Sequence, residues 1–178
     1  MAKTRKFIIG ISVLSILVLI YFAYGLYINP KSPRGTAVYK KENTEIKINY
    51  YRPFKKERLI FGSTSEGALV PFGTYWRLGA NLRTKLKINT SITFANRLLE
   101  KGTYGLYVHP YVNNWVVTVH SNYRGWGYSE PEPEGIVMQV NLPTTLLTDS
   151  VEQLTIDFVE DDLRIRWDTT QVVIPLGK

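Results

Sequence analysis

An alternation of apolar and polar side chains runs through residues 45–51, whose sequence is EIKINYY. Ile46, Ile48 and Tyr50 would share one face of a strand, because successive side chains of a β-strand point to opposite faces. The side chains between them are charged or polar. A strand with one buried and one solvated face is typical of an antiparallel sheet, so this stretch favours an all-β fold.

Similar runs follow along the chain, each short, rich in β-branched and aromatic residues, and bounded by Gly, Pro, Asn or Asp. They are residues 83–94, 103–109, 114–121, 136–142, 154–159, 163–168 and 171–175. We expect turns at residues 100–102 and 160–162 to close two hairpins. The segment 142–154 contains Pro143 and would form at most a turn or two of helix. The pattern predicts an antiparallel β-sandwich, jelly-roll-like or Greek-key, over residues 44–178.

An uncharged apolar run at residues 7–28 precedes the predicted sheet, with the sequence FIIGISVLSILVLIYFAYGLYI. As a helix it would be about 33 Å long at ~1.5 Å per residue, enough to cross a hydrocarbon core of ~30 Å. Aromatic rings gather towards its C-terminal end, where they suit a membrane–water interface, and Pro30 would stop it. We therefore expect a transmembrane helix over residues 1–28 and a linker over residues 29–43.

The charges around the apolar run indicate its orientation. Lys3, Arg5 and Lys6 before the run favour a cytoplasmic N-terminus and an extracytoplasmic, periplasmic domain, although basic residues after the run weaken this signal. A cleaved signal peptide is the alternative, with Ala23-Tyr24-Gly25 as a small-x-small cleavage site. The length of the run and the bulky tyrosines favour an uncleaved anchor. The domain is exported in either interpretation.

The composition excludes several kinds of chemistry. The chain has 178 residues, a formal net charge of +7 and no cysteine, which removes disulfides, zinc–thiolate sites and thiol nucleophiles. Most of the positive excess lies before residue 101 and beyond a membrane helix, so we expect no nucleic-acid partner. No residues have the spacing of a metal or catalytic site, and we expect no cofactor. The expected partners are membrane lipid around the helix and a membrane protein complex.

Several short pieces, spaced in order along residues 46–175, resemble one bacterial family catalogued as protein of unknown function 2911. They are Tyr51-Arg52-Pro53, Ile60-Phe61-Gly62, Val70-Pro71-Phe72-Gly73, Trp76-Arg77, Gly79-Ala80-Asn81, Gly102-Thr103-Tyr104, Pro110, Trp115, Trp126-Gly127, Trp167 and Ile174-Pro175. The resemblance implies an exported β-sandwich domain and no particular activity. Members of the family have an acidic residue directly after the Gly-Ala-Asn triplet. Here Leu82 and Arg83 follow it, so no role that needs a carboxylate carries over.

The first candidate site is the segment Trp76-Arg77-Leu78-Gly79-Ala80-Asn81. Arg77 presents a planar fork that suits a carboxylate or phosphate, and Asn81 offers both a donor and an acceptor. With Trp76 beside them, these groups could bind a polar small molecule. In the alternative, which we favour, Trp76 fills the core, Arg77 bonds loop carbonyls or a buried acid, and the Gly-Ala-Asn triplet forms a tight turn.

The second candidate site lies between the runs 114–121 and 136–142 and contains Tyr123, Arg124, Trp126 and Tyr128. Aromatic rings among glycines could stack on a sugar or on a partner's surface. Equally, a long connection could fold its rings onto the sheet, and the sequence favours neither interpretation. An acidic, proline-rich segment follows and is typical of a solvated, extended rim; its acids are Glu130, Glu132 and Glu134.

Two further groups have simple structural explanations. His109 and His120 could act as a base or a metal pair, but chance placement at strand ends is the favoured interpretation. The outward row of Arg83, Lys85 and Lys87 would keep a sheet face soluble and discourage edge pairing. The same row could instead face anionic lipid headgroups.

The sequence favours a non-enzymatic, membrane-anchored β-sandwich that binds a partner protein or an envelope ligand. An accessory subunit of a membrane complex would fit this description, since tethering raises effective concentration at the membrane. The alternative is an exported enzyme that acts on a small envelope substrate around Arg77, Asn81 and a histidine. In a third interpretation the tyrosine-rich helix itself makes lateral contacts within a larger membrane complex.

Overall fold

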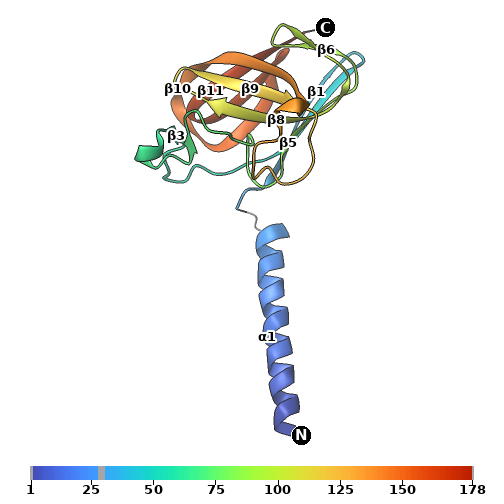
Figure 1. The fold of residues 1–178 in the computed structure, drawn as a ribbon, viewed down its shortest axis with the longest axis vertical. Coiled ribbons are helices and arrows are strands. Elements are labelled where there is room, and N and C mark those ends of the chain that lie inside the picture. The colour runs from blue at the N-terminus through green and yellow to red at the C-terminus, as the bar shows by residue number, and fades with distance from the viewer. Residues whose placement is uncertain (1, 28–30, 178) are drawn as a thin grey trace. The chain divides into compact units, whose positions relative to one another are not determined.

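The computed structural model describes residues 2–27 and 31–177, and it divides the chain into two compact units, residues 1–33 and 34–178. The first unit contains one helix, α1 (Ala2–Tyr27) (Figure 1). Ile28 and Pro30, where the sequence predicts the end of the helix, lie outside the described residues.

Helix α1 is long and apolar enough to cross a membrane. Its apolar window covers 19 residues, Arg5–Ala23, and no part of that window is buried by the rest of the structure. Ser15, one of its few polar residues, donates its hydroxyl hydrogen bond back to the carbonyl of Ile11 at 3.0 Å, which keeps that group satisfied away from water. An N-terminal signal sequence has the same length and composition.

The second unit is built from eleven strands in the described residues. They are β1 (Arg34–Lys41), β2 (Thr44–Tyr51), β3 (Phe61–Gly62), β4 (Val70–Pro71), β5 (Thr84–Ile88), β6 (Ile92–Phe94), β7 (Arg97–Leu99), β8 (Gly102–Pro110), β9 (Asn114–His120), β10 (Ile136–Val159) and β11 (Asp162–Gly177), with short 3-10 helices at Thr64–Glu66 and Pro133–Gly135. Nine of them form one antiparallel sheet in the order β1-β2-β5-β8-β9-β10-β11-β6-β7, and β3 and β4 form a small parallel pair. The predicted all-β, antiparallel fold is confirmed.

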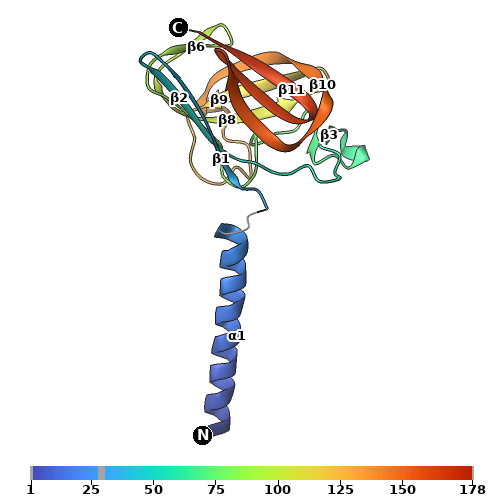
Figure 2. The ribbon, with the colours of Figure 1, turned by 180° about the vertical axis from the view of Figure 1, so that it is seen from behind.

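Strand β10 lets this single sheet cover both sides of one core. Its first part pairs with β9 through Pro143, and its remainder pairs with β11 from Thr144 onward. The sheet then folds back on itself, so that strands far apart in its order face each other. One contact between them is the hydrogen bond that the Tyr50 hydroxyl accepts from the backbone N–H of Ile156 at 2.8 Å. That bond joins β2 to the second part of β10. Figures 1 and 2 show the resulting two layers from opposite sides.

Four aromatic rings from distant parts of the chain meet at the centre of the core. Trp76 stacks on Trp167 with ring centroids 5.7 Å apart, and it meets Trp115 edge-on at 5.6 Å. Phe61 completes the group at 5.1 Å from Trp115. These rings come from β3, β9, β11 and the loop before β5, so their burial ties the loops to both layers of the sheet.

The structure differs from the sequence prediction in where strands begin and end. The run 83–94 is two strands, β5 and β6, which lie in different parts of the sheet, with β6 paired to β11. Residues 142–154 continue β10 as a strand instead of forming a helical turn. Residues 34–41, expected to belong to the linker, form β1 and pair fully with β2.

One of the two predicted hairpins is confirmed and the other is wrong. Phe158 pairs with Leu163 across the turn at residues 160–162, where Glu160 adopts a positive φ of 54°. The turn at 100–102 does not join neighbouring strands. There β7 pairs with β6, whereas β8 pairs with β5 and β9, because the chain passes from one layer of the sheet to the other.

Candidate functional site

The two segments identified separately in the sequence lie side by side in the structure. Leu82, which follows the first segment, pairs with Trp126 of the second in an antiparallel β-bridge. Backbone hydrogen bonds of 3.1 and 3.2 Å flank this bridge. The two loops therefore form one ordered surface. We call its solvent-facing side chains the ring surface, which comprises Arg77, Tyr123, Arg124, Trp126 and Tyr128.

Trp76 supports this surface from inside the core. Its side chain is buried, its indole N–H donates to the carbonyl of Gly79 at 3.2 Å, and its backbone exchanges two 2.8 Å hydrogen bonds with Val108. A residue held in this way cannot touch a partner directly. In the structure Trp76 fills the core, which is the structural role favoured from the sequence.

Arg77 contacts the backbone of Asn81 within the first loop. One guanidinium nitrogen of Arg77 donates to the backbone carbonyl of Asn81 at 3.0 Å, and Asn81 adopts the left-handed backbone, with φ 57°, of a tight turn. The guanidinium carbon lies 5.5 Å from the centroid of the Tyr128 ring, within range of a cation–π interaction. A Cβ at Gly127 would approach the Cβ of Arg77 to 2.8 Å, so only glycine fits beside it.

The rings of the second loop face solvent. Trp126 is 65% exposed and Tyr128 is 85% exposed, so these two rings do not fold onto the sheet. Tyr123 is half-buried, with the ammonium nitrogen of Lys85 5.6 Å from its ring centroid and the guanidinium carbon of Arg124 at 5.3 Å. Aromatic and cationic groups thus alternate across the surface.

A cluster of tyrosines and histidines lies near the ring surface on β8 and β9. The Tyr107 ring sits 5.9 Å from the His109 ring and 6.1 Å from the His120 ring, measured between centroids. Tyr107 therefore lies beside both imidazoles, and no direct contact joins them in the described residues. The ring of Tyr75 packs 5.2 Å from that of Tyr107, and its hydroxyl donates to the carbonyl of Gly127 at 3.3 Å. Nothing in the sequence identifies Tyr75 as a member of this cluster except its position next to Trp76.

His120 is a structural residue. It is almost fully buried, its Nδ1 accepts the backbone N–H of Asn122 at 2.9 Å, and its Nε2 lies 2.9 Å from the carbonyl of Glu132. With Nδ1 accepting from Asn122, Nε2 is placed to donate to the carbonyl of Glu132. His120 thereby fixes both ends of the loop that carries Trp126.

His109 is more accessible and pairs with an acid. Its Nε2 lies 3.4 Å from a carboxylate oxygen of Glu130. The nearby Tyr107 hydroxyl lies beside Thr118 and Glu130. It is buried and makes no hydrogen bond to any described residue. Burial raises the pKa of Tyr107, and burial likewise raises the pKa of Tyr75 despite the nearby Arg83. Both phenols are therefore neutral at physiological pH, and they offer donors rather than charges.

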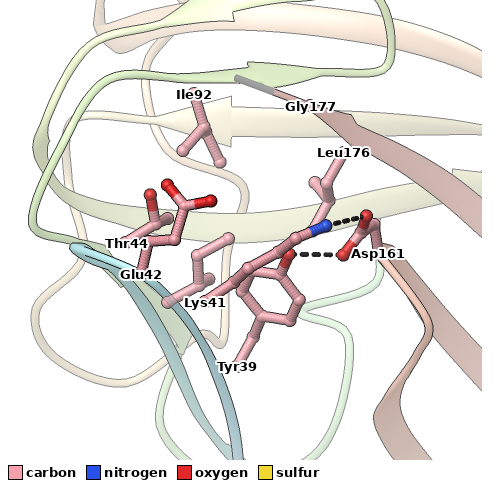
Figure 3. Close-up of a pocket in the computed structure, with 9 residues that line it drawn as sticks. Tyr39, Lys41, Glu42, Thr44, Ile92, Asp161, Leu176 and Gly177 are labelled. Atoms are coloured by element: carbon pink, nitrogen blue, oxygen red, sulfur yellow. Dashed lines mark hydrogen bonds and ion pairs between the residues drawn. The ribbon is translucent and has the colours of Figure 1, made fainter.

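A separate hollow of about 240 Å³ lies between the β1–β2 turn and the end of β11 (Figure 3). Ile92 and Leu176 supply apolar walls. At the rim, Asp161 accepts hydrogen bonds from the hydroxyl of Tyr39 at 2.6 Å and from the ammonium of Lys41. The acid is therefore engaged by its neighbours, and the hollow carries no arrangement suited to catalysis. Across residues 2–27 and 31–177, no three His, Cys, Asp or Glu side chains form a metal-binding group.

The fold and the loops together define an antiparallel β domain preceded by an apolar N-terminal helix. The model of one protein family, described as Protein of unknown function (DUF2911), matches residues 32–176, and the chain belongs to that family. The match begins before β1, in agreement with the structural boundary of the domain. The resemblance noted in the sequence is confirmed. Neither the curated proteins nor the solved structures include a match to the chain.

Proposed function

We propose that the chain is a single-pass membrane protein whose β domain binds a partner protein or an envelope ligand through the ring surface. In this proposal the N-terminus is cytoplasmic, α1 remains as the anchor, and the domain is extracytoplasmic, in the periplasm. The observation that carries it is the exposure of Trp126 and Tyr128 on a backbone held by a β-bridge.

Rigid presentation of exposed rings favours binding over a merely solvated loop. Leaving a large ring in water forgoes the free energy of its burial, about 25 cal/mol per Å² of apolar surface. Because the loop is already ordered by its bridge and by His120, association need not order its backbone, which removes part of the entropy cost of binding. Trp, Tyr and Arg, which make up the ring surface, are also the residues that dominate measured binding hot spots.

An enzyme around Arg77, Asn81 and a histidine has less support. Arg77 uses one guanidinium nitrogen to hold the backbone carbonyl of Asn81, which is a structural contact within the loop, and His120 is held by two backbone partners. His109 with Glu130 is the remaining acid–base pair. A working site would need these groups to converge on one substrate position, and the contacts of the described residues give no such convergence.

Replacing Trp126 with alanine is expected to weaken binding by about 2 kcal/mol or more if the ring is a hot spot. The fold should be unaffected, since exposed substitutions usually change stability by less than ~0.5 kcal/mol. The measurement is recovery of partners by affinity purification from mild detergent with mass spectrometry, alongside the thermal unfolding midpoint. Lys47→Ala, on the outer face of β2, is the matched control. Unchanged recovery with Trp126→Ala would contradict the proposal.

The full-length chain should remain in the membrane fraction after carbonate extraction. The reason is that the uncharged part of α1, residues 7–27, is about 31 Å long at ~1.5 Å per residue, which matches a hydrocarbon core of ~30 Å. Immunoblotting of the pellet and supernatant, with a peripheral membrane protein as control, gives the result. Recovery of a soluble form that starts near Leu26 would identify the helix as a cleaved signal and end the anchor part of the proposal.

A further inference from the structure

The ring surface lies at the end of the domain where β1 begins. Arg34, the first residue of β1, pairs with Tyr51, and its side chain donates to the Tyr51 hydroxyl at 3.1 Å. The backbone of Tyr51 lies directly against Gly79, where an added Cβ would meet the Tyr51 carbonyl at 2.7 Å. Gly79 belongs to the first loop of the surface. In both ribbon views, the loop after β9 is drawn at the same end of the domain as the start of β1 (Figures 1 and 2).

The covalent connection to the helix limits how far this end of the domain can lie from a membrane. Helix α1 ends at Tyr27 and β1 begins at Arg34. Seven chain steps of about 3.3–3.6 Å reach at most about 25 Å. With α1 spanning a membrane, the start of β1 stays within that reach of the lipid headgroups, and the loops beside it share this position.

The chemistry of the ring surface matches a headgroup layer. Trp and Tyr favour the membrane–water interface because they combine an apolar body with a polar tip. Arg77, Arg124 and Lys85 lie among the rings, and each cation near an anionic membrane surface favours binding by about fivefold. Of the three acids that follow the rings in the sequence, Glu130 lies 3.4 Å from His109, and Glu132 and Glu134 are exposed further along the loop.

We propose that the ring surface docks on the anionic phospholipid headgroups of the membrane that holds α1. The inference rests on the proposed anchor and binding surface, and it names the envelope ligand that this surface takes. The rings enter the interface and the cations pair with phosphates, so the domain is held against the membrane at two points. A protein partner on the same surface would leave the rings outside the lipid.

The tryptophans provide a direct test with the full-length chain. Of the four, Trp76, Trp115 and Trp167 are at most 7% exposed, and Trp126 is the exposed one. None lies in α1, so quenching of tryptophan emission by lipid reports on Trp126. The chain is reconstituted into vesicles of phosphatidylcholine alone or with phosphatidylglycerol, each containing phosphatidylcholine brominated near the headgroup. We expect strong quenching with phosphatidylglycerol, weak quenching without it, and partial release in ~1 M salt, where the screening length falls to ~3 Å.

Two variants complete the design. Trp126→Phe should abolish the lipid-dependent quenching, which assigns it to that ring. Arg124→Gln should reduce the docked-to-undocked ratio about fivefold while leaving the emission in detergent unchanged. Quenching that is absent, or equal in the two kinds of vesicle, would overturn the inference. If that occurs while Trp126→Ala still loses a protein partner, the binding surface stands and its ligand is a protein. If recovery is also unchanged, the binding surface itself is wrong.

Discussion

Replacing Trp76 with alanine is expected to lower the free energy of unfolding by about 3–5 kcal/mol, the usual cost of truncating a buried tryptophan. The ring stacks on Trp167 and meets Trp115 and Phe61, so its removal leaves a cavity bounded by three other aromatic side chains. These neighbours belong to different strands, and local repacking cannot refill the space without moving the sheet.

The measurement is urea unfolding of the full-length chain in detergent, followed by near-ultraviolet circular dichroism. Trp126→Ala is the matched control, since it removes the same side chain from an exposed position and should shift the midpoint little. Equal midpoints for the two variants would show that the four-ring group does not hold the core together.

Replacing Gly79 with alanine is expected to lower the free energy of unfolding by about 2–6 kcal/mol, although only one carbon is added. Gly79 adopts φ 147°, a conformation that side chains rarely tolerate and whose strain costs about 1–3 kcal/mol. The added Cβ would also lie 2.7 Å from the backbone oxygen of Tyr51, and overpacking of this kind costs a further ~1–3 kcal/mol. The neighbour is backbone, so it cannot rotate away.

Gly67→Ala separates the two contributions to this cost. Gly67 also has a positive φ, 72°, but nothing lies within 4 Å of the Cβ that alanine would add, so only the backbone strain of about 1–2 kcal/mol applies. Unfolding in urea should therefore give a clearly larger loss for Gly79→Ala. A loss no greater than that of Gly67→Ala would mean that the loop moves away from Tyr51, and would weaken the placement of the ring surface beside β1.

The all-β fold could be predicted because a strand that buries one face has an apolar side chain at every second position. In β2 and β5 every second side chain is buried, and that alternation is visible in EIKINYY and in residues 84–88. The continuity of β10 could not be predicted. Its middle section, from Thr144 to Glu152, has no buried side chain, so the alternation disappears where the strand crosses between layers. Pro143 adds a local signal for a break that the structure does not follow.

The members of the ring surface could be predicted, but their assembly could not. Composition alone identified Arg77 and the loop of Trp126, since aromatic and arginine residues among glycines are unusual. The bridge between Leu82 and Trp126 joins positions more than forty residues apart, and no periodicity reports such a contact. The role of His120 could not be predicted for another reason. Its two partners lie only 2 and 12 residues further along the chain, but both are backbone groups, and the sequence pattern does not report contacts between a side chain and the backbone.

The length of β10 has a consequence for how the domain is made. A chain that has been synthesised only as far as Gly135 already contains β1, β2, β5, β8 and β9, yet it lacks the strand that both layers share. Its apolar face would stay uncovered until β10 and β11 emerge. Nonsense mutations late in the coding sequence should therefore leave an aggregation-prone, protease-sensitive chain, because the last quarter of the polypeptide supplies the covering layer for everything before it.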